Sequence, residues 1–326
     1  MLKVKAIALF SGGLDSILAV KVIQEQGIDV LGVTFATPFF GAQKSIEAAK
    51  RIGLPLLTID ITEEYLAMLK APRYGYGRNM NPCIDCHTLM LKIAGGKMKE
   101  LGADFLFTGE VMGQRPMSQG KQSLHIVAKN SGYNGYVLRP LSGRLLPETI
   151  PETEGKVDRE KLFDIQGRGR KQQMEMTIKY GISDYSTPAG GCLLTDRMFS
   201  KRLKDLFEHG EDFKVRDIEL LKTGRHIRLD EKTKIIVGRN KSDNAAIQGL
   251  SEDGDIVITM THFPGPTVLV PYGCNDKTLD HAAAICALYS SAPDGEEVEA
   301  GCKIGTTVKS ISTTAAKRDD VKNLII

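Results

Sequence analysis

The feature that most constrains this chain is a glycine turn close to its N-terminus. An apolar run over 6–10 leads directly into six residues, Ser11, Gly12, Gly13, Leu14, Asp15 and Ser16. A buried strand, a glycine turn and a helix start would aim backbone N–H groups and two hydroxyl groups at one small volume, which suits a phosphate. Glycine lets an anion approach the main chain closely. Because Asp15 would repel a phosphate, we expect Mg²⁺ to bridge its carboxylate to the phosphate oxygens.

The turn differs from the Walker phosphate-binding loop, because the pattern Gly-x-x-x-x-Gly-Lys-Ser/Thr is absent. The order Ser-Gly-Gly-x-Asp-Ser instead resembles the pyrophosphate loop (PP-loop) of the ATP pyrophosphatases. These enzymes cleave ATP between its α- and β-phosphates to adenylate a substrate. The resemblance implies that Ser11 to Ser16 bind ATP and that Asp15 is a catalytic residue acting through Mg²⁺. The alternative is a glycine-rich turn that only caps a helix.

Length and composition limit the remaining possibilities. The 326 residues are enough for two hydrophobic cores. A net charge of +3 does not by itself indicate nucleic-acid binding, so an RNA contact must come from a local patch. Apolar tracts of membrane-spanning length and a signal-peptide pattern are both missing, which predicts a cytoplasmic protein with no membrane partner.

The order of the predicted elements indicates an α/β fold with a doubly wound, mainly parallel sheet, followed by a smaller α+β domain. Strands are predicted over 6–10, 30–35, 56–59 and 105–108, with helices between them, the last over 88–101. We expect a PP-loop domain over 1–200, a helical linker over 201–217 and a second domain over 218–326. In such sheets ligands bind beyond the carboxyl ends of the strands, where the PP-loop, Thr34-Phe35 and Gly109 lie.

Three of the six cysteines are placed for chemistry. Cys83 and Cys86 form a Cys-x-x-Cys pair where a helix is expected to begin, and Cys192 follows two glycines. We expect the helix N-terminus to lower the pKa values of the pair. Three thiolates suit a 4Fe–4S cluster with one open iron. Two suit a persulfide relay, and zinc bound with His87 or another ligand is a third possibility.

Two further segments resemble tRNA-modifying enzymes. The segment 107–119, with Thr-Gly-Glu-Val-Met-Gly-Gln and a later Ser-Gln, resembles part of the tRNA 4-thiouridine synthetases, as does Leu-Arg-Pro-Leu at 138–141. Asn-Pro-Cys at 81–83 and the later Cys192 are similar to the cysteine pair of tRNA-specific 2-thiouridylases. The resemblance, over about 6–195, implies a tRNA uridine sulfurtransferase. It implies catalytic Cys83, Cys86 and Cys192, and adenosine contacts from Thr34, Phe35 and Gly109.

The C-terminal part resembles the NFACT RNA-binding domain. The resemblance rests on Ile-Ile-Val-Gly-Arg-Asn at 235–240, His-Phe-Pro-Gly-Pro at 262–266 and the alanine-rich helix that follows. Four basic residues are candidates for holding RNA phosphates: Arg225, Arg228, Arg239 and Lys241. The alternative is a solvated charged face on an accessory or dimerisation domain.

Together these features predict ATP-dependent thiolation of a tRNA uridine, with sulfide or a cysteine-desulfurase relay as sulfur donor. The thiolated carbonyl, C2 or C4, stays open, as does a homodimer. With Cys86 the chain has three candidate thiols, and in this it resembles the iron–sulfur-dependent tRNA thiolases more than the persulfide type. One competing hypothesis is a PP-loop synthetase that adenylates a small molecule. The other is a non-catalytic RNA-binding or iron–sulfur module.

Overall fold

The computed structural model describes residues 3–115, 117–185, 191–210 and 212–326. The chain divides into two compact units, Met1–Thr195 and Asp196–Ile326. The first contains a parallel sheet flanked by helices and the second an antiparallel sheet with helices, so the predicted fold class is confirmed. Of the two glycines that precede Cys192, Gly190 lies outside the described residues.

The first unit is built on a five-stranded parallel sheet in the order β3-β2-β1-β4-β5. Its strands are β1 (Lys5–Leu9), β2 (Asp29–Ala36), β3 (Leu56–Asp60), β4 (Phe105–Thr108) and β5 (Val137–Leu138). The chain builds outward from β1 through β2 to β3, then crosses to β4 on the other side of β1. This reversal of strand order lies beside the carboxyl end of β1, where open α/β sheets bind ligands.

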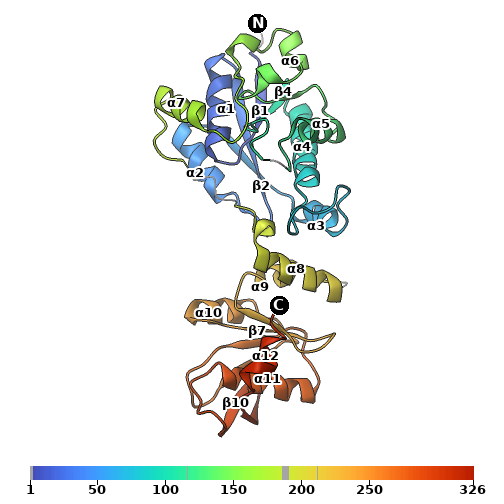
Figure 1. The fold of residues 1–326 in the computed structure, drawn as a ribbon, viewed down its shortest axis with the longest axis vertical. Helices are drawn as coiled ribbons and strands as arrows, with labels where there is room; N and C mark the ends of the chain where they lie inside the picture. Colours follow the sequence, from blue (N-terminus) through green and yellow to red (C-terminus); the bar gives the residue numbers. More distant parts are fainter. Residues whose placement is uncertain (1–2, 116, 186–190, 211) are drawn as a thin grey trace. The chain divides into compact units, whose positions relative to one another are not determined.

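Helices cover both faces of this sheet (Figure 1). They are α1 (Leu14–Glu25), α2 (Gln43–Ile52), α3 (Thr62–Lys70), α4 (Cys83–Glu100), α5 (Lys121–Asn130), α6 (Ile150–Thr153) and α7 (Lys171–Lys179). Helices α1 and α7 pack together on one face, and α4 and α5 pack together on the other. Successive residues of β1 point to opposite faces, and Ala6, Ile7 and Ala8 are all buried, as a strand covered on both sides requires.

One helix boundary differs from the prediction. Helix α4 begins at Cys83 rather than at residue 88, with Pro82 as its N-cap. Proline cannot continue a helix backward but is tolerated at its start. Both cysteines of the Cys-x-x-Cys pair therefore lie in the first turn of the helix.

The second unit contains a six-stranded antiparallel sheet in the order β11-β10-β8-β9-β7-β6. Its strands are β6 (Arg225–Arg228), β7 (Lys234–Val237), β8 (Ile256–Met260), β9 (Val268–Val270), β10 (Glu297–Ile304) and β11 (Thr307–Thr314). Its helices are α8 (Arg197–His209), α9 (Val215–Leu220), α10 (Lys241–Gly249), α11 (Asp276–Leu288) and α12 (Arg318–Lys322). Helix α11 packs its buried side chains on β8, β9 and β10.

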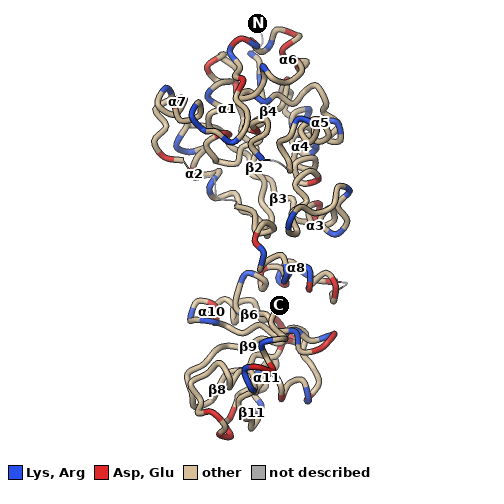
Figure 2. Tube along the Cα trace, in the orientation of Figure 1, with Lys and Arg blue, Asp and Glu red and all other residues tan. Residues whose placement is uncertain are grey.

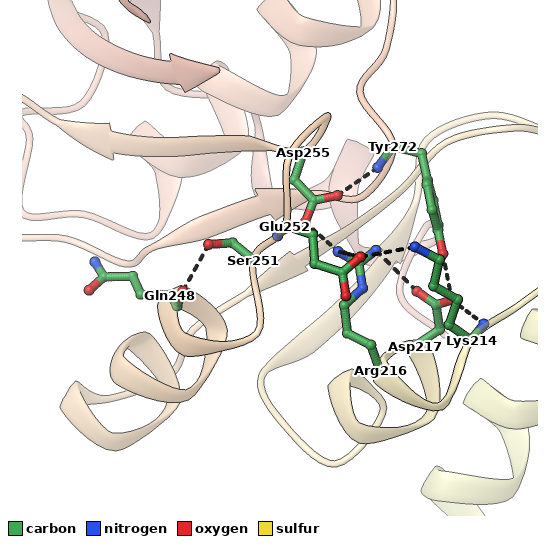
Figure 3. Close-up of polar contacts among 8 residues, drawn as sticks. All are labelled: Lys214, Arg216, Asp217, Gln248, Ser251, Glu252, Asp255 and Tyr272. Carbon is green, nitrogen blue, oxygen red and sulfur yellow. Dashed lines mark hydrogen bonds and ion pairs between the residues drawn. The ribbon is translucent and has the colours of Figure 1, made fainter. Parts of the chain in front are cut away.

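A buried ionic network ties the start of α9 to the loops beside β8 and β9 (Figure 3). Arg216 donates to Asp255 over 2.6 Å, and its guanidinium group lies 5.0 Å from the ring centre of Tyr272. Tyr272 has φ of +62° and donates its hydroxyl to Asp217 over 2.6 Å. A tyrosine in this left-handed conformation is strained, and the contacts around it hold it there.

Among the described residues, no helix has both the length and the apolar composition needed to cross a lipid bilayer.

Candidate active site

The phosphate loop lies between β1 and α1 and is packed against α2. Gly12 has φ of +71°, and a Cβ there would lie 2.7 Å from the carbonyl oxygen of Lys44 and 2.9 Å from Ser45 Cα. Both the backbone conformation and this close approach require glycine. The Ser16 hydroxyl donates to the carbonyl of Gly13 over 2.8 Å, and no described side chain caps α1. The first turn of α1 is therefore open toward an anion.

Strand β4 delivers Gly109 directly onto the same turn of α1. A Cβ at Gly109 would lie 2.5 Å from Ser16 N and 2.6 Å from the carbonyl carbon of Asp15. Backbone atoms are not free to turn aside as a flexible side chain does. The end of β4 and the start of α1 therefore touch backbone to backbone, at a distance only glycine permits.

The other predicted nucleotide residues lie around this loop. Thr34 and Phe35 are buried at the carboxyl end of β2, and Phe10 N donates to the carbonyl of Val33 over 2.8 Å. This bond places the end of β2 beside the start of the loop. Leu14 belongs to the hydrophobic core, so its side chain serves the fold, and only its backbone can meet a ligand.

Asp15 is the charged residue of the loop. Burial raises the pKa of its carboxyl group above the ordinary value of 3.8. Four neighbouring side chains oppose this rise: Gln114, Arg170, Gln173 and Arg115. The Asp15 Oδ1 atom is buried and has no hydrogen-bond partner in the described structure. A bound cation would supply the missing partner and stabilise the charged carboxylate.

These residues fit Mg²⁺ with a polyphosphate. Mg²⁺ prefers carboxylate and phosphate oxygens, and Asp15 offers an unpaired carboxylate oxygen. The open first turn of α1 offers N–H donors to phosphate oxygens. The Ser11 hydroxyl lies beside it and makes only a long hydrogen bond, of 3.4 Å, to the Ser16 hydroxyl.

A second polar cluster begins one residue after Gly109. Glu110 is buried and accepts from Arg139 Nε over 3.1 Å and from the Thr108 hydroxyl over 3.0 Å. Its other oxygen lies 2.8 Å from His87 Nδ1. Burial alone would raise the pKa of Glu110, but Arg139 and His87, with Thr108, lower it to about 2. Glu110 is thus an anion at neutral pH, held between β4, α4 and the residue after β5.

The structure brings the three predicted cysteines into one neighbourhood. Cys83 accepts from the Asn81 amide over 3.3 Å, and Tyr65 lies close enough to Cys86 to lower the pKa of its thiol. Cys192 precedes a short 3₁₀ helix, η3 (Leu193–Thr195). The charges of Cys83 and Cys192 both act on the pKa of Cys86, which places the three sulfur atoms within electrostatic range of one another.

The expected lowering of the cysteine pKa values is wrong for Cys86. Burial raises the pKa of Cys86 to about 12 and that of Cys192 to about 11. The partial charge of a helix N-terminus is smaller in effect than the loss of hydration around a buried sulfur. Without a bound metal, these two thiols are therefore protonated at neutral pH.

A single metal ion does not fit this cluster. The described residues contain no group of three or more His, Cys, Asp or Glu side chains arranged to hold one ion. His87, the fourth ligand considered for zinc, has its Nδ1 at Glu110. Three cysteines are nevertheless the donor set of an iron–sulfur cluster, which spreads its ligands more widely than one ion.

The basic residues predicted to contact RNA are engaged in different ways. Arg228 makes a two-pronged ion pair with Asp205, at 3.0 and 2.6 Å. Arg239 pairs with Asp243 over 2.6 Å but stays partly exposed. Figure 2 shows positive and negative residues interspersed along α8, so this element is not uniformly basic.

The two remaining basic residues are freer to meet a ligand. The guanidinium group of Arg225 lies 4.8 Å from the ring centre of Tyr289. Lys241 is exposed at the first position of α10.

Four residues that sequence reasoning gave no role stand out in the structure: Glu110, Arg139, Arg170 and Gln173. Glu110 and Arg139 belong to the two motifs quoted above for their resemblance, and the ion pair joins one motif to the other in the folded chain. No sequence motif marks Gln173 and Arg170, since they come close to Asp15 only in the folded chain.

Comparisons with known proteins agree with the two resemblances, which are thereby confirmed. Residues 2–150 match the family described as Thiamine biosynthesis protein (ThiI), and residues 224–325 match the NFACT protein RNA binding domain.

The chain is also similar to tRNA-specific 2-thiouridylases (MnmA). It is 31% identical to that of Micrococcus luteus over 45% of this chain and 44% of the relative. It is 24% identical to that of Listeria welshimeri over 62% of this chain and 56% of the relative. The chain thus spans less than half the length of the Micrococcus protein.

Among solved structures, a predicted subunit of tRNA methyltransferase from Methanocaldococcus jannaschii aligns with a TM-score of 0.36 at 15% identity, over 54% of this chain and 76% of that one.

Proposed function

We propose that this chain, matched by the ThiI family over residues 2–150 and by the NFACT RNA-binding domain over residues 224–325, is an ATP-dependent tRNA uridine sulfurtransferase. One structural observation carries the proposal. Gly109 touches the phosphate loop, and the next residue, Glu110, binds His87, the neighbour of Cys86. Two adjacent residues thus connect the candidate nucleotide site to the candidate sulfur site.

In the first step a uridine carbonyl oxygen attacks the α-phosphorus of ATP. A new phosphorus–oxygen bond forms as the bond to the β-phosphate bridging oxygen breaks, and pyrophosphate leaves. Asp15 would hold the Mg²⁺, which would neutralise charge on the phosphate oxygens, and the open first turn of α1 donates N–H groups to these oxygens. The chain thereby positions the phosphates and stabilises the developing charge, with no strong base required.

In the second step a sulfur nucleophile attacks the activated ring carbon, and the carbon–oxygen bond breaks to release AMP. When bound to Cys83, Cys86 and Cys192, a 4Fe–4S cluster supplies an iron that can hold sulfide. With sulfide the step needs no oxidant or reductant. A persulfide on one cysteine is the alternative, in which a second cysteine releases the product and a disulfide forms between the two.

The raised pKa values of Cys86 and Cys192 support the cluster over the relay. A relay needs a free thiolate, whereas a bound metal itself stabilises the thiolates of its ligands. The sulfur donor, which is either sulfide or a cysteine-desulfurase relay, remains a prediction. A homodimer also remains a prediction.

The proposal is tested with the full chain, ATP and unmodified tRNA. We expect AMP to form only when tRNA is present and mass spectrometry of the digested tRNA to show a thiouridine. Asp15→Ala should abolish both products, whereas Glu25→Gln, at the exposed far end of the same helix, should retain them. AMP formation that is independent of tRNA would contradict the proposal and favour a small-molecule synthetase.

The sulfur centre is tested by anaerobic purification. Cluster binding predicts a brown protein that contains iron and sulfide, and Cys86→Ser should lose both the colour and the thiolation. A colourless, iron-free and active enzyme would contradict the cluster and support the persulfide relay.

The RNA-binding role of the second unit is tested at Lys241. A lysine at the first position of a helix opposes the helix dipole, so Lys241→Glu should not impair folding. If Lys241 contacts a phosphate, the variant should bind tRNA more weakly and lower the salt dependence of binding by about one unit. Lys303→Glu, an exposed site on β10 of the same unit, is the matched control. Equal effects of the two variants would contradict a specific contact.

A further inference from the structure

Helix α7 presents a glutamine whose burial the hydrophobic core does not explain. Gln173 is fully buried, and neither its amide oxygen nor its amide nitrogen has a hydrogen-bond partner in the described structure. An unsatisfied buried amide costs about 1–3 kcal/mol, and most buried polar groups in folded proteins are paired. A glutamine in this position therefore indicates a partner beyond those that the described residues supply.

Gln173 is one of three side chains near the phosphate loop that carry buried polar atoms without a hydrogen-bond partner in the described structure. The side-chain nitrogen of Gln114 and Oδ1 of Asp15 are also buried without partners. Both glutamine amides lie close enough to Asp15 to stabilise its charge, although neither reaches it with hydrogen-bond geometry. The three side chains come from three segments that are far apart in the sequence. Their unpaired atoms therefore gather around Asp15, beside the phosphate loop.

The backbone holds these segments in register. Residues Met112 and Gln166 form a parallel bridge, and Gly167 N donates to the carbonyl of Met112 over 2.8 Å. This bridge fixes the segment that leads into α7 against the segment that carries Gln114. Helix α7 in turn packs on α1, the helix that begins at the phosphate loop.

The charge of this region favours a polyanion. Arg170, the N-cap residue of α7, and Arg115 both act electrostatically on Asp15. Two guanidinium groups together with Mg²⁺ outweigh the single negative charge of Asp15. The region is therefore net positive when Mg²⁺ is bound, and its unpaired amides can donate to phosphate oxygens or accept from water on the metal.

We propose that Gln173, Arg170 and Gln114 form a second wall of the phosphate site, opposite the Ser11–Ser16 loop, that binds the pyrophosphate released from ATP. The inference rests on the proposed function, because it assumes cleavage between the α- and β-phosphates. The wall binds the β- and γ-phosphates in ATP and retains them as inorganic pyrophosphate after the bond breaks. The nucleoside monophosphate portion makes no contact with it.

The test uses the full chain and titrates Mg²⁺–pyrophosphate and AMP separately by calorimetry. Gln173→Leu removes both amide atoms and keeps an apolar side chain that suits burial. We expect it to weaken pyrophosphate binding by 10- to 100-fold, the loss of one hydrogen bond to a charged group, and to leave AMP binding unchanged. Arg170→Gln should show the same selectivity and guards against a folding defect in the first variant.

Gln172→Leu is the matched control, since it changes the same residue type at the adjacent, exposed position of α7. It should bind pyrophosphate as the wild-type chain does. Wild-type pyrophosphate affinity in both Gln173→Leu and Arg170→Gln would overturn the inference and leave the proposed function standing. If the wild-type chain bound neither ATP nor pyrophosphate, the proposed function would fail as well.

Discussion

Adding one methyl group at Gly109 is the sharpest perturbation of the phosphate site that the structure offers. Its φ lies outside the left-handed region, so alanine is compatible with the backbone there. The obstacle is space alone, because the new Cβ would lie 2.5 Å from Ser16 N and 2.6 Å from Asp15 C and O. Gly109→Ala therefore tests whether contact between β4 and α1 positions the loop.

The magnitude follows from that geometry. An ordinary van der Waals contact begins at 3.4 Å, so the first turn of α1 and the end of β4 must separate by roughly 0.9 Å. Overpacking of this kind costs about 1–3 kcal/mol of unfolding free energy. A shift of about 1 Å in positioning groups lowers activity by about 100-fold. We expect Gly109→Ala to remain folded but to lose most of its ATP affinity and turnover.

The assay combines urea unfolding with calorimetric titration of Mg²⁺–ATP. Gly96→Ala is the matched control, because this exposed glycine lies within α4 and its Cβ would meet open space. Alanine there should stabilise the helix by about 0.5–1 kcal/mol and leave ATP binding unchanged. Wild-type ATP affinity in Gly109→Ala would refute the view that this backbone contact sets the position of the loop.

Three other substitutions test the electrostatics of the two units. Glu110→Gln should lower the unfolding free energy by about 3–5 kcal/mol at neutral pH, because it leaves a buried guanidinium unpaired. Since the pKa of Glu110 is lowered to about 2, this stabilisation is present above its ordinary pKa of 4.5 and is lost as the pH falls toward 2. Asp15→Asn should raise the Tm of the ligand-free chain at neutral pH, because the raised pKa of Asp15 means that its charge destabilises the fold. The same variant should lose the rise in Tm that Mg²⁺–ATP produces. Asp255→Asn should destabilise the second unit by about 1.5–3 kcal/mol, because Arg216 loses the shorter of its two buried ion pairs and keeps Asp217, while ATP affinity stays unchanged.

Each of these predictions has its own control and contrary outcome. The loss in Glu110→Gln should shrink between pH 5 and pH 2, and a pH-independent loss would contradict the charge argument. An unchanged or lower Tm in ligand-free Asp15→Asn would mean that the charge of Asp15 is not costly. Glu252→Gln, at a half-exposed position of the Figure 3 network, should cost less than about 1 kcal/mol. A cost equal to that of Asp255→Asn would contradict the role of burial.

The sequence predicts this site well wherever neighbouring residues define it. The phosphate loop, its strand and its helix are contiguous, so the residues that form them also identify them. The doubly wound sheet follows in the same way from alternating segments, and the structure confirms it. The start of α4 is harder to predict from the sequence. Weak helix formers around Cys86 give no periodic apolar pattern, and the boundary depends on Pro82.

The features of the site that cannot be predicted from the sequence depend on contacts between residues far apart in the chain. Gln173 is 158 positions from Asp15, and no local pattern marks a glutamine that will be buried beside a carboxylate. The prediction that the pKa of the Cys86 thiol is lowered fails for the same reason. A helix N-terminus can be predicted from nearby residues, but the burial that outweighs it at Cys86 comes from tertiary packing.

The Glu110 cluster explains how the two halves of the proposed reaction can share one geometry. Adenylation takes place at a carbonyl oxygen of the uridine and sulfur transfer at the carbon of the same carbonyl, so the sulfur site must be fixed relative to the phosphate site. Loops alone would not fix it, but a buried ion pair between β4 and Arg139 resists displacement, since separating its charges leaves each uncompensated. Its link to His87 extends this rigidity to the first turn of α4, which carries the cysteine pair. The cluster is therefore best understood as a positioning device, because Glu110, held as an anion by its partners, is too weak a base to take a proton from uridine.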